Sequence, residues 1–231
     1  MRIDVITCLP HLLESPLRHF LFQRAIKKGL LSLEIHNLRD YTPYKHGKID
    51  DQPYGGEAGM VLMVEPIANC IRALQQQRHY DEIIYMAPDG KILDQAVVNS
   101  CSLKQNLMVL CGHYKGIDER IRTHFITLEI SVGDYVLSGG ELPAILFADA
   151  LVRVLPAVLS DASAALTDSF QDGWIAPPVY TRPYVYEGMK VPDVLLSGNH
   201  KAIQAWAHQE AVKRTQERRP HLMEEVPPLN P

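Results

Sequence analysis

The sequence predicts an α/β fold with a parallel sheet and helices on both faces. Short apolar runs alternate with segments of helical periodicity over residues 1–155. Most of these runs contain few polar residues, which is typical of strands that are buried on both sides. Three runs also end in loops with turn residues, at 85–90, 111–116 and 131–140. Because parallel strands share a direction, we expect these three loops to open on one edge of the sheet.

The first predicted strand covers residues 2–9, and the second covers 30–36. Between them we expect a helix that begins at Ser15-Pro16 and runs to Lys28. Serine is a frequent helix cap, and proline is tolerated in a first turn. Gly29 then favours the end of the helix.

A long irregular segment follows, from Arg39 to Gly59. Loops of this length are uncommon in compact domains unless they are functional or disordered. The aromatic residues of the segment argue against disorder. We therefore interpret it as a substrate-handling loop, with a passive surface loop as the alternative.

The next part of the chain alternates helices and strands. We expect helices over 64–77, 93–103, 117–122 and 141–155, with Asp118 and Glu119 in the first turn of the third. The strands expected between them cover 81–86, 106–111 and 125–130. The first of these strands is expected to end at a turn over 87–90.

The loop between the last strand and the last of these helices contains three glycines, at positions 133, 139 and 140. Glycine allows unusual backbone angles and lets a ligand approach the main chain closely. A purely structural turn is the alternative, but the similar loop at 111–116 favours a ligand site. No GxGxxG follows a strand and no GxxxxGK[ST] occurs, so neither the dinucleotide fingerprint nor the P-loop is present.

After residue 160 the composition changes. Prolines are frequent between 177 and 192, so this part cannot be helical throughout. A helix is then expected over 199–219. We predict a first domain over 1–160, a linker over 161–173 and a small, mainly helical C-terminal domain over 174–231.

The formal net charge of −4 provides no overall basic field for nucleic acid. The region 197–221 is nevertheless basic, with five Lys or Arg residues against two Glu residues. It predicts either a solvated helix face or a local contact with nucleic acid. The four cysteines form no CxxC pair, and no signal peptide or membrane span is apparent. We therefore expect reduced thiols and a cytoplasmic protein.

Several segments together resemble the bacterial tRNA (guanine-N1-)-methyltransferase family, from the first strand to about Leu222. These segments are DDQPYGG at 50–56, CGHYKGIDER at 111–120, SVGDYVLSGGELP at 131–143, DSF at 168–170, YTRP at 180–183 and LSGNH at 196–200.

The resemblance implies a SPOUT-class fold with a deep trefoil knot formed around residues 85–140. It also implies a homodimer. The expected reaction is methyl transfer from S-adenosylmethionine to N1 of the guanine at position 37 of tRNA, next to the anticodon. The alternatives are a non-catalytic RNA-binding protein with this fold and a SPOUT enzyme that methylates another RNA position.

By the same resemblance, Asp168 is the general base that removes the N1 proton, and Arg153 stabilises the charge that develops on the guanine. Without the resemblance, Asp168 would be interpreted as a helix cap beside Ser169. Arg153 would be interpreted as an amphipathic surface side chain.

The resemblance also implies two sets of binding residues. The cofactor set is Tyr85, Met86, Ala87, Pro88, Gly112, Tyr114, Gly116, Val132, Gly133, Asp134, Tyr135, Val136, Leu137, Gly139, Gly140 and Pro143. The tRNA set is Asp50, Tyr54, Gly55, Gly56, Gly59, Arg182, His200, Lys213 and Arg214.

Three positions depart from the family pattern. Lys115 and Ala176 stand where the family commonly has acidic residues that are linked to its magnesium dependence. Glu57 replaces a commoner glycine. We expect magnesium to act weakly or through the RNA alone.

Overall fold

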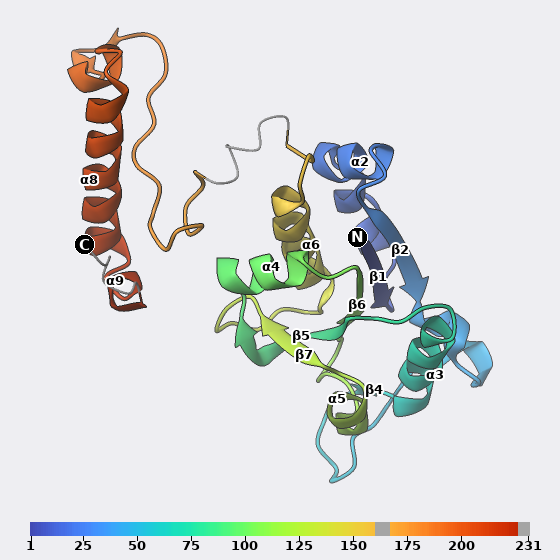
Figure 1. Cartoon of the computed structure of the whole chain (residues 1–231). Coiled ribbons are helices and arrows are strands. Elements are labelled where there is room, and N and C mark those ends of the chain that lie inside the picture. Colours follow the sequence, from blue (N-terminus) through green and yellow to red (C-terminus); the bar gives the residue numbers. More distant parts are fainter. Residues whose placement is uncertain (160–166, 226–231) are drawn as a thin grey trace. The chain divides into compact units, whose positions relative to one another are not determined.

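The computed structural model describes residues 1–159 and 167–225 (Figure 1). The chain divides into two compact units, Met1–Ser160 and Asp161–Pro231. Residues 161–166 of the predicted linker lie outside the described residues. Residues 167–173 form turns and bends that belong to the second unit.

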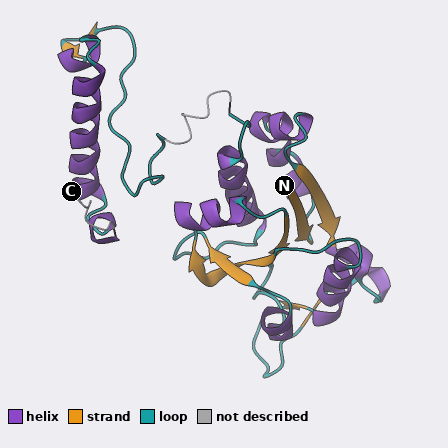
Figure 2. Cartoon of the chain, in the orientation of Figure 1, coloured by secondary structure: helices purple, strands orange, loops and turns teal. Residues whose placement is uncertain are grey.

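The first unit contains a five-stranded sheet in the order β2-β1-β6-β5-β7. Figure 2 colours the strands orange and the helices purple. Neighbouring strands are parallel throughout, which confirms the α/β prediction. The strands are β1 (Arg2–Thr7), β2 (Ser32–Asn37), β5 (Glu82–Ile92), β6 (Asn106–Cys111) and β7 (Leu128–Ser131). The predicted knot stays a prediction, because strand pairing does not test it.

Helices cover both faces of this sheet, as predicted. On one face α2 (Phe20–Lys27), α4 (Gln95–Ser102) and α6 (Glu141–Val154) enclose one apolar cluster. On the other face α3 (Val64–Gln75) and α5 (Glu119–His124) enclose a second cluster. Alternate residues of β6 point into each cluster, so this strand is buried on both sides.

The helix predicted from Ser15 to Lys28 is wrong in its first half. The chain forms a short helix α1 (His11–Glu14), a 3₁₀ turn η1 (Pro16–Arg18) and then α2. The Ser15 side chain makes no capping hydrogen bond. His19 has an extended backbone, so the helix begins again only at Phe20.

The turn predicted at 87–90 does not end the strand. The pairing of β5 with β7 is irregular between Met86 and Lys91, and both residues align with Ile130. The Pro-Asp-Gly signal therefore produces a bulge, after which the strand resumes.

Two smaller boundaries also differ. Asp118 caps α5 from outside, since its side chain accepts a hydrogen bond from the Arg120 backbone. The helix therefore begins at Glu119. The strand predicted from 125 begins at Leu128.

The segment 39–59 is more ordered than predicted. It contains two 3₁₀ turns, η2 (Leu38–Tyr41) and η3 (Lys45–Gly47). It also contains β3 (Asp50–Asp51), which pairs with β4 (Val61–Leu62) in an antiparallel hairpin. The hairpin is anchored on the next glycine loop, because the Leu62 N–H donates to the Gly116 carbonyl at 3.0 Å.

The second unit has a long helix, α8 (His200–Arg218), in place of the helix predicted over 199–219. The Asn199 side chain caps it by accepting from the Ala202 N–H at 3.2 Å. The preceding part is not helical throughout, which confirms the prediction from its prolines. The other elements are the hairpin β8 (Val185–Tyr186) and β9 (Met189–Lys190), the 3₁₀ turn η4 (Asp193–Leu196) and the short helix α9 (Leu222–Glu225).

The segment before this hairpin packs along α8. The Ile175 N–H donates to the Thr215 hydroxyl at 2.9 Å. Farther along, the rings of Tyr180 and Trp206 lie 6.4 Å apart between centroids. These contacts hold the extended segment against the helix. Among the described residues, no helix is both long and apolar enough to cross a membrane.

Asp4 of β1 is fully buried in a polar network. Its carboxylate accepts hydrogen bonds from Arg2 at 2.8 Å and Tyr80 at 2.8 Å, and it contacts His36 at 2.7 Å. Burial by itself would raise the pKa of Asp4. The hydrogen bonds from His36, Arg2 and Tyr80 outweigh it and hold the pKa well below its usual range.

We expect Asp4→Asn to lower the free energy of unfolding at pH 7 by about 3 kcal/mol, because it leaves buried partners without their anion. Urea denaturation measures this difference. The depressed pKa stabilises the fold only where unfolded Asp is ionised. The difference from wild type should therefore be full above about pH 5 and shrink below about pH 4.

The matched control is Asp51→Asn. Asp51 is exposed and pairs with Lys48 at 2.7 Å, so its loss should change stability little. Equal effects of the two substitutions would contradict the importance of the Asp4 network.

Candidate functional site

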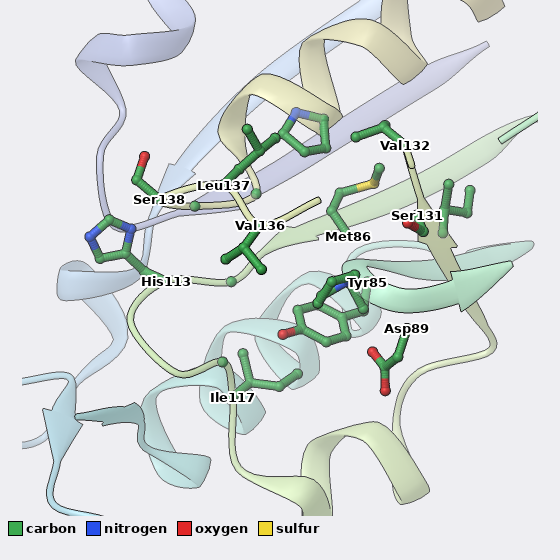
Figure 3. A pocket seen from close by; sticks show the side chains of 18 of the residues that line it. Tyr85, Met86, Asp89, His113, Ile117, Ser131, Val132, Val136, Leu137 and Ser138 are labelled. Atoms are coloured by element: carbon green, nitrogen blue, oxygen red, sulfur yellow. The ribbon is translucent and has the colours of Figure 1, made fainter. Parts of the chain in front are cut away.

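Residues 85–89, which lie within β5 around its irregularity, line one cavity of about 510 Å³ together with the loops that follow β6 and β7. Figure 3 shows the apolar side chains of Met86, Val132, Val136 and Leu137 in this cavity. His113 and Ser138 lie at one end of the view and Asp89 at the other. An apolar cavity with polar groups at its margins is typical of small-molecule sites.

Tyr85 forms part of the cavity wall and is itself buried. Burial raises the pKa of Tyr85 to about 12, so its hydroxyl stays protonated at neutral pH. Its ring leaves no room for larger residues in the neighbouring loop, since a Cβ at Gly112 would lie 2.8 Å from the Tyr85 hydroxyl. The tyrosine therefore fits this loop only because the loop carries a glycine.

Arg122 of α5 supports the same wall. Its guanidinium lies 5.6 Å from the centroid of the Tyr85 ring. It donates to Glu129 at 2.8 and 2.6 Å and to Asp89 at 2.8 Å. This charge network joins α5, β5 and β7 beside the cavity.

The glycine loop before α6 lies directly against the end of β6. The Gly140 N–H donates to the Gly112 carbonyl at 2.8 Å, and His113 pairs with Gly139. A Cβ on Gly140 would lie 2.8 Å from both the Cys111 Cα and the Gly112 nitrogen. Glycine is therefore required here by close approach of two backbones.

Glu141, the first residue of α6, links this loop to β1. Its side chain is buried, and it accepts a hydrogen bond from the Thr7 hydroxyl at 2.7 Å. A carboxylate is favoured at this position by the positive end of the helix dipole.

All the predicted cofactor residues except Asp134 line the cavity. Asp134 is exposed in the loop that follows β7. Residues of the lining that were not predicted are Asp89, His113, Lys115, Ile117, Arg122, Ile130, Ser131 and Ser138. Most of them adjoin predicted residues along the chain, whereas Arg122 enters from α5 and no motif marked it.

At the two positions where the family commonly has acidic residues, the side chains of this chain provide no ligand for magnesium. The Lys115 ammonium donates to Glu57 at 2.6 Å, so this position carries a paired cation. Ala176 has no donor atom in its side chain. Magnesium takes oxygen ligands, and neither Lys115 nor Ala176 supplies one from its side chain.

Among the described residues, one group of side chains has metal-ligand character: Cys8, His113 and Glu141. One atom from each lies within 4.8 Å of the others. Burial, with a smaller effect from Glu141, raises the pKa of Cys8 to about 11, so the thiol is protonated at neutral pH. A sulfur, a nitrogen and a single carboxylate do not suit magnesium.

The two predicted catalytic residues lie on different units. Arg153 is exposed in the last turn of α6. Asp168 is half-buried in the turns at 167–174. No helix begins at Asp168, so its interpretation as a helix cap is wrong. The neighbouring Ser169 hydroxyl instead accepts from the Ala176 N–H at 2.9 Å.

The predicted tRNA residues fall into two groups. The first occupies the β3–β4 hairpin and its loop, where Tyr54 is completely exposed. The second belongs to the C-terminal unit, where Arg182, His200 and Lys213 are exposed. Arg214 is half-buried and donates to the Ala176 carbonyl at 3.3 Å.

Comparison with known proteins identifies similar sequences. The sequence model of the family described as tRNA (Guanine-1)-methyltransferase TrmD matches residues 1–225. A relative from Cytophaga hutchinsonii, named tRNA (guanine-N(1)-)-methyltransferase, is 60% identical over 96% of this chain and 94% of its own length. Relatives of the same name from Flavobacterium johnsoniae and Bacteroides thetaiotaomicron are 56% and 55% identical, over 97% of this chain and their entire length.

Because the Gly140 backbone angles are ordinary, Gly140→Ala tests the close approach alone. We expect the added methyl group to lower the free energy of unfolding by about 1–3 kcal/mol through overpacking. Thermal and urea denaturation measure it. Ser138→Ala is the matched control, because Ser138 is exposed in the same loop. Equal stability of the two variants would contradict the backbone contact.

Proposed function

The chain belongs to the tRNA (guanine-1)-methyltransferase family, and from this membership we propose that it methylates N1 of the guanine at position 37 of tRNA, next to the anticodon. The methyl donor is S-adenosylmethionine. The observation that carries the proposal is the cavity beside β5, where the residues of the family motifs at 111–116 and 131–143 converge after β6 and β7. The protein acts in the cytoplasm, where tRNA is available.

The cavity suits the donor molecule in its chemistry. Apolar side chains such as Met86 and Leu137 line the cavity and provide surface for the flat faces of an adenine ring. The glycines of the two loops allow a ligand to approach the main chain closely. The cavity volume of about 510 Å³ lies in the range of small-molecule sites.

The methyl transfer requires a base for the guanine. N1 carries a proton and becomes nucleophilic as that proton leaves. In the proposed step the Asp168 carboxylate takes the N1 proton, N1 forms a bond to the methyl carbon, and the bond from sulfur to that carbon breaks. The electron pair returns to sulfur, which leaves S-adenosylhomocysteine and N1-methylguanine. The Arg153 guanidinium stabilises the negative charge that spreads to O6 during this step.

A homodimer is part of the proposal. The exposed positions of α6 are Leu142, Leu146, Asp149 and Arg153, which form one stripe at helical spacing. The two leucines are about half exposed, at 54% and 52%. A partner subunit that covers this stripe would bury the leucines and border Arg153. Sedimentation of the full-length protein as a monomer at assay concentrations would contradict the dimer.

The tRNA contacts follow from charge and exposure. Lys213 and His200 are exposed on α8, and Arg182 is exposed in the segment that precedes β8. Lysine and arginine side chains in such positions bind the phosphate backbone and make affinity depend on salt. The loop of the β3–β4 hairpin, with Tyr54 fully exposed, is proposed to receive the flipped guanine.

The decisive experiment measures methyl transfer from tritiated S-adenosylmethionine to unmodified tRNA transcripts. We expect wild type to label N1 of the guanine next to the anticodon, and to leave a transcript with adenine at that position unlabelled. We expect Asp168→Asn to transfer at a rate about 10²- to 10⁴-fold lower, because the amide cannot accept the proton. Binding of the methyl donor should remain.

Magnesium is varied in the same experiment. If the ion acts through the RNA alone, a polyamine that folds the transcript should sustain transfer without magnesium. Wild type that binds tRNA but transfers no label under either condition would favour the non-catalytic alternative. Full activity of Asp168→Asn would support the methyltransferase activity but contradict the role of Asp168 as the general base.

A further inference from the structure

The C-terminal unit contains a second hollow, of about 360 Å³, whose lining includes none of the predicted catalytic and cofactor residues. It is formed by the β8–β9 hairpin and the segment that leads into it. Its polar and aromatic lining includes Tyr180, Arg182, Tyr184, Tyr186 and Lys190. Its size is that of a small-ligand site.

Three tyrosine rings border this hollow, and they are exposed by 42–58%. Two are held in place. Tyr180 packs against Trp206 of α8, and the Tyr184 hydroxyl donates to Asp193 at 2.8 Å. Tyr186 is exposed by 58%. Rigid aromatic faces left open to solvent are suited to stack on a flat ligand.

The charges of the hollow favour an anion beside that flat ligand. Arg182 and Lys190 are both exposed in the lining. Within residues 1–159 and 167–225, neither forms an ion pair. The nearest acids in the sequence are Glu187, in the hairpin turn, and Asp193, which is engaged by Tyr184.

We propose that this hollow binds one unpaired nucleotide of the tRNA anticodon loop, other than the methylated guanine. The base stacks on the tyrosine rings, and Arg182 and Lys190 contact its flanking phosphates. The inference rests on the proposed function, which makes tRNA the ligand. Only an unpaired base can expose its face to such a hollow, since paired bases are covered by their neighbours in the stack.

The test combines protein variants with abasic RNA. Fluorescent tRNA transcripts carry a single abasic nucleotide at each unpaired position of the anticodon loop in turn, with the target guanine kept. Affinity is measured with the full-length protein at fixed salt. We expect one abasic transcript to bind wild type about tenfold more weakly than the intact transcript, which is typical of one lost stacking contact.

Tyr186→Ala should bind the intact transcript about tenfold more weakly than wild type does. It should bind that one abasic transcript as wild type binds it, because the stacking contact is already absent. Tyr186→Phe keeps the ring and should bind as wild type does. Val179→Ala is the matched control, because Val179 is 91% exposed in the same segment but lies outside the hollow. Lys190→Gln should lower the slope of log affinity against log salt by about one.

The proposal is overturned if Tyr186→Ala binds every transcript with the affinity of wild type. It is also overturned if Tyr186→Ala weakens the binding of every abasic transcript by the same factor as that of the intact transcript. An unchanged salt slope in Lys190→Gln overturns the phosphate contact even if Tyr186→Ala fails to fold. Methylation by wild type separates the two proposals. If wild type transfers the methyl group but Tyr186→Ala shows no dependence on any abasic position, only the proposed nucleotide site is overturned. If that dependence is found without methyl transfer, the enzymatic function is overturned and the hollow remains an RNA site.

Discussion

The parallel insertion of β6 between β1 and β5 is the constraint on which the rest of the structure depends. It gives β5, β6 and β7 a common direction, so the loops that follow them must meet at one edge. The cavity forms where residues 85–89 of β5 meet the loops after β6 and β7, beside two apolar clusters that lie on the two faces of the sheet. Backbone contacts between Gly140 and the Cys111–Gly112 peptide bring the loop after β7 against the loop after β6.

Buried polar groups stabilise this arrangement in two places. At one end of β1, Asp4 connects the sheet to Arg2, His36 and Tyr80. At the other end, Thr7 holds the Glu141 carboxylate at the start of α6. Apart from Arg2, the partners of both groups are far away in the sequence. Such partners tie separate elements together with a directionality that apolar packing lacks.

The two units divide the chemistry between them. The first unit offers an apolar cavity with glycine loops, which suits a small, flat and partly apolar donor. The second offers exposed aromatic rings and cations, which suit an extended anion such as RNA. Within the first unit, the Lys115–Glu57 ion pair couples the cavity loop to the loop of the β3–β4 hairpin.

The sequence by itself determined the order of strands and helices, the parallel sheet and the loops that carry the cavity. It could do so because apolar runs, glycines and prolines act locally on the backbone. It did not determine the split of the first helix, the continuation of β5 past Gly90 or the entry of Arg122 into the cavity wall. The last two features depend on Ile130, Glu129 and Tyr85, which meet their partners only after the chain has folded. Tertiary structure alone decided them, because long-range pairing and packing outweigh local preference where the two compete.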